Sequence, residues 1–91
     1  MTKKQGAIIK VYGKVQGVGF RYYTHKKAVE LELTGFVQNR PDGSVYIEAE
    51  GAEEKLDQFI LWCNEGPGWA RVTNVQVQRT PPWGYSRFEI R

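Results

Sequence analysis

Cysteine and histidine are scarce in this sequence, with one residue of each type, Cys63 and His25. A single cysteine cannot form an internal disulfide or a cysteine-based metal site. The uninterrupted apolar runs are only a few residues long, too short to span a bilayer, and residues 1–6 lack the apolar stretch of a signal peptide. We therefore expect a cytoplasmic protein that does not associate with membranes.

The length and charge of the chain limit its organisation further. Ninety-one residues are enough for one hydrophobic core and one domain, which we assign to residues 7–91 after an N-terminal tail of residues 1–6. Thirteen Lys and Arg against ten Asp and Glu give a net charge of +3. This weak excess suits an anionic ligand but is too small to require nucleic acid.

Hydrophobic periodicity predicts two helices. Residues 21–33 have an apolar stripe at three- and four-residue spacing and are followed by Thr34 and Gly35, which we expect to end the helix. Residues 53–64 carry a second stripe, with acids at the N-terminal end. The stripes are Phe20, Thr24, Ala28 and Leu31 in the first helix, and Leu56, Phe59, Ile60 and Cys63 in the second. Each helix should therefore pack one face on a core.

Five other segments have the β-branched or alternating pattern of strands. They are residues 7–12, 36–39, 45–50, 70–78 and 86–90. A turn at residues 40–43 joins two of them, because Pro41 and Gly43 stand at the positions that a type I turn favours. The order predicts an α+β, ferredoxin-like split βαβ fold, with two helices on one face of a mostly antiparallel sheet and an extra C-terminal strand.

A glycine-rich loop precedes the first helix. Gly17 and Gly19 can adopt positive φ angles that turn successive backbone N–H groups toward one point, and the helix adds N–H donors and its positive dipole end. Arg21 can add two parallel hydrogen bonds to a phosphoryl group. The loop lacks the Gly-Lys-Ser/Thr ending of a Walker A motif and the third glycine of a dinucleotide fingerprint. These residues predict either a cradle for an oxyanion or an ordinary structural turn, because a glycine-rich turn between a strand and a helix is a weak signal by itself.

The segment from Val11 to Arg21 closely resembles the first signature of the acylphosphatases, whose core reads Gly-x-Val-Gln-Gly-Val-x-Phe-Arg. The second signature of that family is also present, without a departure at any signature position. It consists of Gly35-Phe36-Val37-Gln38-Asn39, three further residues, Gly43-Ser44-Val45, five further residues and Gly51. The resemblance covers nearly the whole chain.

The resemblance implies a small cytosolic enzyme that hydrolyses the carboxyl–phosphate bond of acyl phosphates without a metal or organic cofactor. It implies that Arg21 binds the substrate phosphate and that Asn39 holds the attacking water. The phosphate-binding set would be Gln16, Gly17, Val18, Gly19, Phe20 and Arg21, acting through the loop N–H groups and the arginine side chain. We expect a monomer whose ligands are an acyl phosphate and the product, inorganic phosphate.

The chemistry of the residues agrees with this reading. A carboxylate leaving group, whose conjugate acid has a pKa of about 4–5, departs without a general acid. Phosphoryl transfer then needs charge stabilisation and an in-line nucleophile. Neither the loop of residues 13–21 nor residues 35–39 contain an Asp, Glu, His or Cys for proton transfer, so a water activated mainly by position is the simplest mechanism.

Two alternative functions remain: RNA binding, and a non-catalytic role in binding or regulation. A ferredoxin-like sheet with a basic edge could bind RNA, although the strands at 7–12 and 45–50 offer only Tyr12 and Tyr46 as stacking aromatics. A non-catalytic acylphosphatase-like module, acting in binding or regulation, is the alternative within the family. The presence of both Arg21 and Asn39 argues against it.

The remaining candidate residues are assigned mainly to packing. We expect His25 to lie at the surface or to be partly packed, Cys63 to be a buried thiol, and the three tryptophans to serve packing or loops rather than base stacking. Tyr22 and Tyr23 could border the substrate entrance or pack, and Lys14 could steer an anion toward the loop. The tryptophans are Trp62, Trp69 and Trp83.

Overall fold

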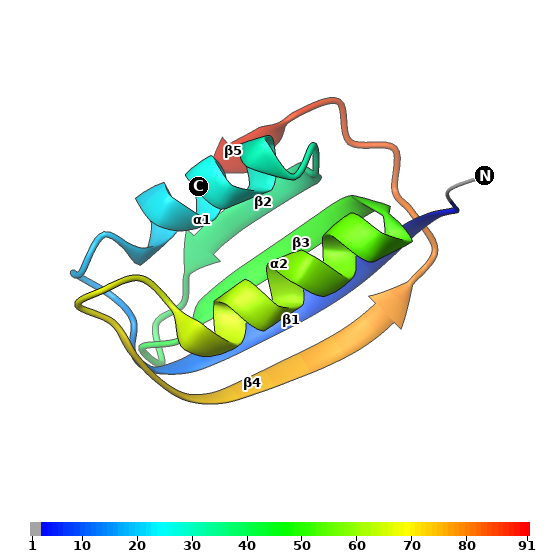
Figure 1. Cartoon of the computed structure of the whole chain (residues 1–91). Coiled ribbons are helices and arrows are strands. Elements are labelled where there is room, and N and C mark those ends of the chain that lie inside the picture. The colour runs from blue at the N-terminus through cyan, green and yellow to red at the C-terminus, as the bar shows by residue number, and fades with distance from the viewer. Residues whose placement is uncertain (1–2) are drawn as a thin grey trace.

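The computed structural model describes residues 3–91, in which two helices cover one face of a five-stranded sheet (Figure 1). The elements are β1 (Lys4–Lys14), α1 (Phe20–Glu30), β2 (Thr34–Asn39), β3 (Val45–Ala52), α2 (Glu53–Glu65), β4 (Arg71–Thr80) and β5 (Phe88–Ile90). The strand order is β4-β1-β3-β2-β5, and only the β2–β5 pair is parallel. The predicted ferredoxin-like fold with an extra C-terminal strand is confirmed.

The core lies between the helices and the sheet. Phe20, Thr24 and Ala28 of α1 are buried, as is Leu31 directly after the helix. In α2 the side chains of Leu56, Phe59 and Cys63 are fully buried, and that of Ile60 is half-buried. They pack against alternate residues of the central strands, including Ile9 of β1 and Ile47 of β3. Burying a side chain of this size contributes about 1.5–3 kcal/mol. Neither helix within residues 3–91 is long and apolar enough to cross a membrane.

The first strand begins earlier than the sequence pattern predicted. β1 starts at Lys4 rather than at residue 7, and Lys4, Gln5 and Gly6 pair with the end of β3. Backbone pairing needs no apolar side chain, so the period-2 pattern does not mark these residues. Of the predicted tail, residues 1 and 2 lie outside the described part of the chain.

The first helix ends earlier than predicted. The final helical residue is Glu30, and Glu32 takes a left-handed conformation with φ of 60°. The N–H of Leu33 then bonds the carbonyl of Ala28 at 2.8 Å, which is the pattern of a helix cap that glycine usually serves. A glutamate at this position gives no sequence signal. Thr34 and Gly35, expected to end the helix, begin β2 instead.

A buried carboxylate fixes the segment that leads to β5. Glu50, at the end of β3, is fully buried and accepts backbone N–H bonds from Trp83 at 2.6 Å, from Gly84 at 3.0 Å and from Tyr85. Three N–H donors on one carboxylate satisfy a charge that would otherwise be costly to bury. Glu50 therefore helps to place β5 beside β2.

We expect Glu50→Gln to lower the free energy of unfolding by about 2 kcal/mol, because the amide nitrogen replaces one acceptor oxygen opposite the backbone donors. Denaturant unfolding followed by circular dichroism measures this change. Glu32→Gln is the matched control, since Glu32 is exposed. Equal stability of the two variants would contradict the role given to the carboxylate.

Candidate active site

The cradle loop is residues 15–19, between β1 and α1, because β1 continues to Lys14 rather than ending at Tyr12 as predicted. Gly17 and Gly19 have φ angles of 73° and 79°, as the loop sequence predicts. Gly19 is the N-cap residue of α1, where no side chain caps the helix and no acidic residue occupies the first turn. The first N–H groups of a helix have no partner inside it, and here no carboxylate offsets the helix dipole. The end of the loop is therefore suited to an anion.

The guanidinium of Arg21 is held toward β5. Arg21 is the second residue of α1, and its Nη1 donates to the main-chain oxygen of Arg91 at 2.9 Å. The N–H of Arg91 in turn bonds the carbonyl of Val37 in β2 at 2.8 Å, and the Arg91 side chain lies over the ring of Phe36. One N–H of the guanidinium is thus used for orientation, and the others can bind a ligand.

Asn39 is the last residue of β2, two positions beyond Val37. Its side chain is half-buried, and its Oδ1 is buried without a hydrogen-bond partner among residues 3–91. A buried acceptor without a donor is costly, and few are found in folded proteins. The amide oxygen therefore has an unused acceptor position at this end of the sheet.

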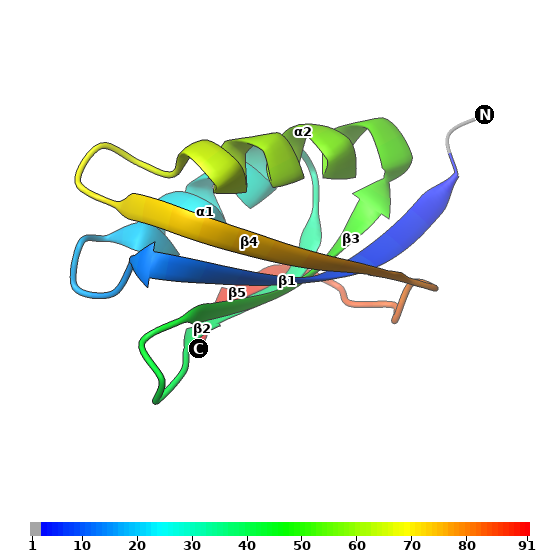
Figure 2. The same cartoon turned by 90° about the horizontal axis from the view of Figure 1, so that it is seen from below.

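The side chain of Gln16 connects the cradle loop to the β2–β3 turn. Its Nε2 donates to the carbonyls of Arg40, at 2.7 Å, and of Ser44, at 2.8 Å. Figure 2 shows the loop after β1 and the turn after β2 at the same end of the sheet. The structure thus brings the cradle, Arg21 and the end of β2 together.

The ionisable groups near the cradle do not form an acid–base pair. Hydrogen bonds from the Ser44 hydroxyl and N–H lower the pKa of Asp42 in the turn, so this carboxyl is an acceptor rather than an acid. Burial raises the pKa of the Cys63 thiol, which makes it a poor nucleophile. Within residues 3–91, no three His, Cys, Asp or Glu side chains gather where they could hold a metal ion.

The open face of the sheet holds its tyrosines in polar contacts. The hydroxyls of Tyr46 and Tyr85 both donate to Glu48. Desolvation and the Glu48 bond raise the pKa of Tyr46 to about 12, and the Glu48 bond and desolvation raise the pKa of Tyr85 to about 12. The Arg40 guanidinium covers the Tyr46 ring at 4.0 Å. A covered ring is a poor stacking platform, so Tyr46 is poorly suited to bind an RNA base.

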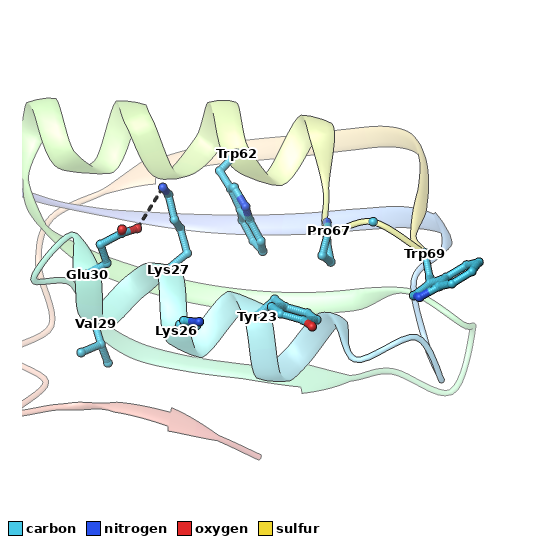
Figure 3. A pocket seen from close by; sticks show the side chains of 9 residues that line it. Tyr23, Lys26, Lys27, Val29, Glu30, Trp62, Pro67 and Trp69 are labelled. Carbon is cyan, nitrogen blue, oxygen red and sulfur yellow. Dashed lines mark ion pairs between the residues drawn. The ribbon is translucent and has the colours of Figure 1, made fainter.

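A groove of about 730 Å³ lies between α1 and α2 (Figure 3), and Arg21 is not among the residues that line it. Tyr23 lines the groove, and its ring lies next to Gly19 of the cradle. Trp62 lines it too and packs on Phe20 and Phe59, as expected for a packing residue. Trp69 is 85 % exposed at the rim. A role for Tyr22 or Tyr23 at a substrate entrance stays a prediction.

The structure also places two other residues that the sequence analysis named. His25 is half-buried, with its ring 6.0 Å from that of Phe88, which agrees with the prediction of a surface or partly packed histidine. Lys14 is exposed at the end of β1, opposite Arg71 of β4. Its side chain adds positive charge beside the loop, and its steering of anions stays a prediction.

Comparison with known proteins decides the family. The Acylphosphatase family model matches residues 7–90. The chain belongs to the acylphosphatase family. An acylphosphatase of Thermotoga maritima is 51 % identical over 83 residues, which cover 91 % of this chain and 92 % of the relative. An acylphosphatase of Mannheimia succiniciproducens is 55 % identical over 76 residues, 84 % of this chain and 81 % of the relative.

The solved structures agree with the sequence relatives. An acylphosphatase from Coxiella burnetii superposes with a TM-score of 0.93 at 40 % identity, over 97 % of this chain and 93 % of that one. The sequence-based predictions of an acylphosphatase and of an enzyme are confirmed.

Two contacts at the candidate site could not be predicted from the sequence. Gln16 was predicted to contribute its backbone N–H, and nothing indicated that its side chain reaches a turn 24 residues away. The contact between Arg21 and Arg91 joins residues 70 positions apart. Both depend on which strands pair, and motif spacing does not carry that information.

Proposed function

We propose that this acylphosphatase hydrolyses the carboxyl–phosphate bond of small acyl phosphates by direct attack of a water held by Asn39. The observation that carries the proposal is the buried, unpartnered Oδ1 of Asn39 at the end of β2, next to the turn that Gln16 ties to the cradle loop. An amide can accept a bond from water and donate one without ionising.

The phosphoryl group binds at the N-terminus of α1. The N–H groups of residues 16–21 surround its oxygens, and the Arg21 side chain adds charge-assisted bonds. Support comes from the positive φ angles of Gly17 and Gly19 and from the uncapped first turn of α1. These donors stabilise the equatorial oxygens as charge develops on them, which phosphoryl transfer requires beside the positioning of the nucleophile.

In the reaction, the water oxygen forms a bond to phosphorus while the bond between phosphorus and the carboxyl oxygen breaks. The carboxylate leaves with the bonding electron pair, and the proton of the attacking water passes to the phosphate product or to solvent. A carboxylate is a stable anion at neutral pH, so no acid has to protonate it. Positioning of the water therefore supplies most of the catalysis.

Release of phosphate from benzoyl phosphate tests the proposed function and separates it from the non-catalytic alternative. An acylphosphatase-like binding module with the same fold would hold phosphate at the cradle without turnover. The proposed enzyme releases phosphate and benzoate in equal amounts, well above the rate in buffer. Phosphate binding without any release would favour the binding module.

We expect inorganic phosphate to inhibit competitively, because the cradle recognises the phosphoryl group that substrate and product share. Chelators should leave the rate unchanged, since the proposed mechanism assigns no step to a metal ion. Initial rates on benzoyl phosphate, with phosphate or EDTA added, measure both effects. Activity lost in EDTA and restored by a divalent ion would contradict the mechanism.

A further inference from the structure

The amide of Gln16 makes two hydrogen bonds that leave no unused donor on its nitrogen. Nε2 lies 2.7 Å from the carbonyl oxygen of Arg40 and 2.8 Å from that of Ser44, and a primary amide has two N–H donors. Gln16 comes directly before Gly17, where the loop turns into its left-handed conformation. The side chain therefore links the first residue of the predicted phosphate-binding set to the β2–β3 turn.

Gln16 contacts the β2–β3 turn, whose own backbone hydrogen bonds close it without the Gln16 side chain. The N–H of Arg40 bonds the carbonyl of Ser44 at 2.9 Å, and the N–H of Gly43 bonds the carbonyl of Arg40 at 3.1 Å. Asp42 accepts from the N–H and hydroxyl of Ser44. Both carbonyls that Gln16 contacts thus keep a backbone donor when Gln16 is changed, so the turn should persist.

Asn39 immediately precedes this turn and pairs with Val45 immediately after it. The turn and Asn39 therefore move together, while the Oδ1 of Asn39 has no hydrogen-bond partner among residues 3–91 that would hold it independently. Two further links join this strand end to the cradle side: Val45 also pairs with Val11 of β1, and the Arg21–Arg91 contact reaches β2 at Val37. Of these links, the Gln16 side chain alone begins within the cradle loop itself.

We propose that the side chain of Gln16 is a positioning residue that sets the distance between the bound phosphoryl group and the water on Asn39. This assignment rests on the proposed function. In-line attack requires the reacting atoms to be about 3–3.5 Å apart, and a misplacement of about 1 Å can cost about 10²-fold in rate. The side-chain amide of Gln16 binds the turn, and the backbone of the same residue belongs to the cradle loop. Gln16 is therefore suited to fix that distance.

Gln16→Met tests the proposal, because methionine has nearly the same length and lacks the donors. We expect kcat on benzoyl phosphate to fall about tenfold or more, while the inhibition constant of phosphate changes less than about twofold. Gln78→Met is the matched control, since Gln78 is exposed on β4. It should retain the wild-type kcat.

A double-mutant cycle with Asn39→Ala separates positioning from a general structural effect. Once the amide of Asn39 is absent, Gln16→Met should lower kcat by less than about twofold further, because both changes disable the same step. An equal factor in both backgrounds would overturn the proposal, as would a loss of phosphate affinity with kcat unchanged. A wild-type protein without turnover would overturn the proposed function, and this assignment with it.

Gln16→Glu provides a second variant if Gln16→Met does not fold. An ionised carboxylate of the same length faces two carbonyl oxygens and cannot donate, so kcat should fall at neutral pH. As the pH is lowered from about 7 toward about 4, the side chain gains a proton and one donor, and kcat relative to wild type should rise. A constant ratio across this range would contradict the donor role.

Discussion

Arg21→Lys should lower the turnover of benzoyl phosphate by about 10²-fold or more, although it keeps the positive charge. The guanidinium offers N–H donors in a planar fork, and one of them is bonded to the main-chain oxygen of Arg91. The others remain to bind two oxygens of one phosphoryl group. Lysine presents a single flexible ammonium, which cannot hold the Arg91 oxygen and a phosphoryl edge in the same geometry.

The affinity for inorganic phosphate should fall together with the rate, because Arg21 contacts the phosphoryl group in both the bound state and the transition state. Calorimetry with phosphate and initial rates on benzoyl phosphate measure the two effects. Arg79→Lys is the matched control, since Arg79 lies on β4 and pairs with Asp57. Near-normal turnover in a folded Arg21→Lys variant would mean that the loop N–H groups alone bind the phosphoryl group.

The fold was largely predictable because its helices and central strands each bury one face. The stripe of Phe20, Thr24 and Ala28 gave the direction in which α1 packs, and strict alternation in β3 gave the buried set of Val45, Ile47 and Ala49. What could not be predicted depends on backbone contacts that leave no apolar pattern. The left-handed cap at Glu32 and the parallel pairing of β5 with β2 are of this kind.

In the candidate site too, some features could be predicted from the sequence and others could not. The cradle could be predicted because positive φ favours glycine, and Gly17 and Gly19 stand directly before a helix. The contacts that place the cradle against β2 could not, since they join side chains to carbonyl oxygens far away in the sequence. Every residue has a carbonyl, so the acceptors of Gln16 and Arg21 carry no signature of their own. The sequence therefore predicted the chemical groups of the candidate site better than the hydrogen bonds that hold those groups in place.

Asn39→Ala should separate catalysis from binding. The substitution removes no positive charge and no loop N–H, so the affinity for inorganic phosphate should change little. We expect kcat on benzoyl phosphate to fall by about 10²-fold or more, because only the orientation of the water is lost and positioning is most of the catalysis.

The structure indicates that Asn39→Ala should leave the fold and the β2–β3 turn unchanged. The Oδ1 of Asn39 has no hydrogen-bond partner among residues 3–91, so the truncation leaves no protein donor unsatisfied. The β2–β3 turn is closed by the backbone bonds of Arg40, Gly43 and Ser44, none of which uses the Asn39 side chain. The free energy of unfolding should therefore stay within about 1 kcal/mol of wild type.

Asn74→Ala on β4 is the matched control, since it makes the same truncation at an exposed position of the opposite edge strand. Phosphate affinity by calorimetry and turnover on benzoyl phosphate are then compared in one folded protein. If affinity and turnover collapse together, Asn39 binds the phosphoryl group and does not hold the nucleophile. If turnover alone is lost, the unpartnered amide oxygen at the end of β2 is the group that orients the attacking water.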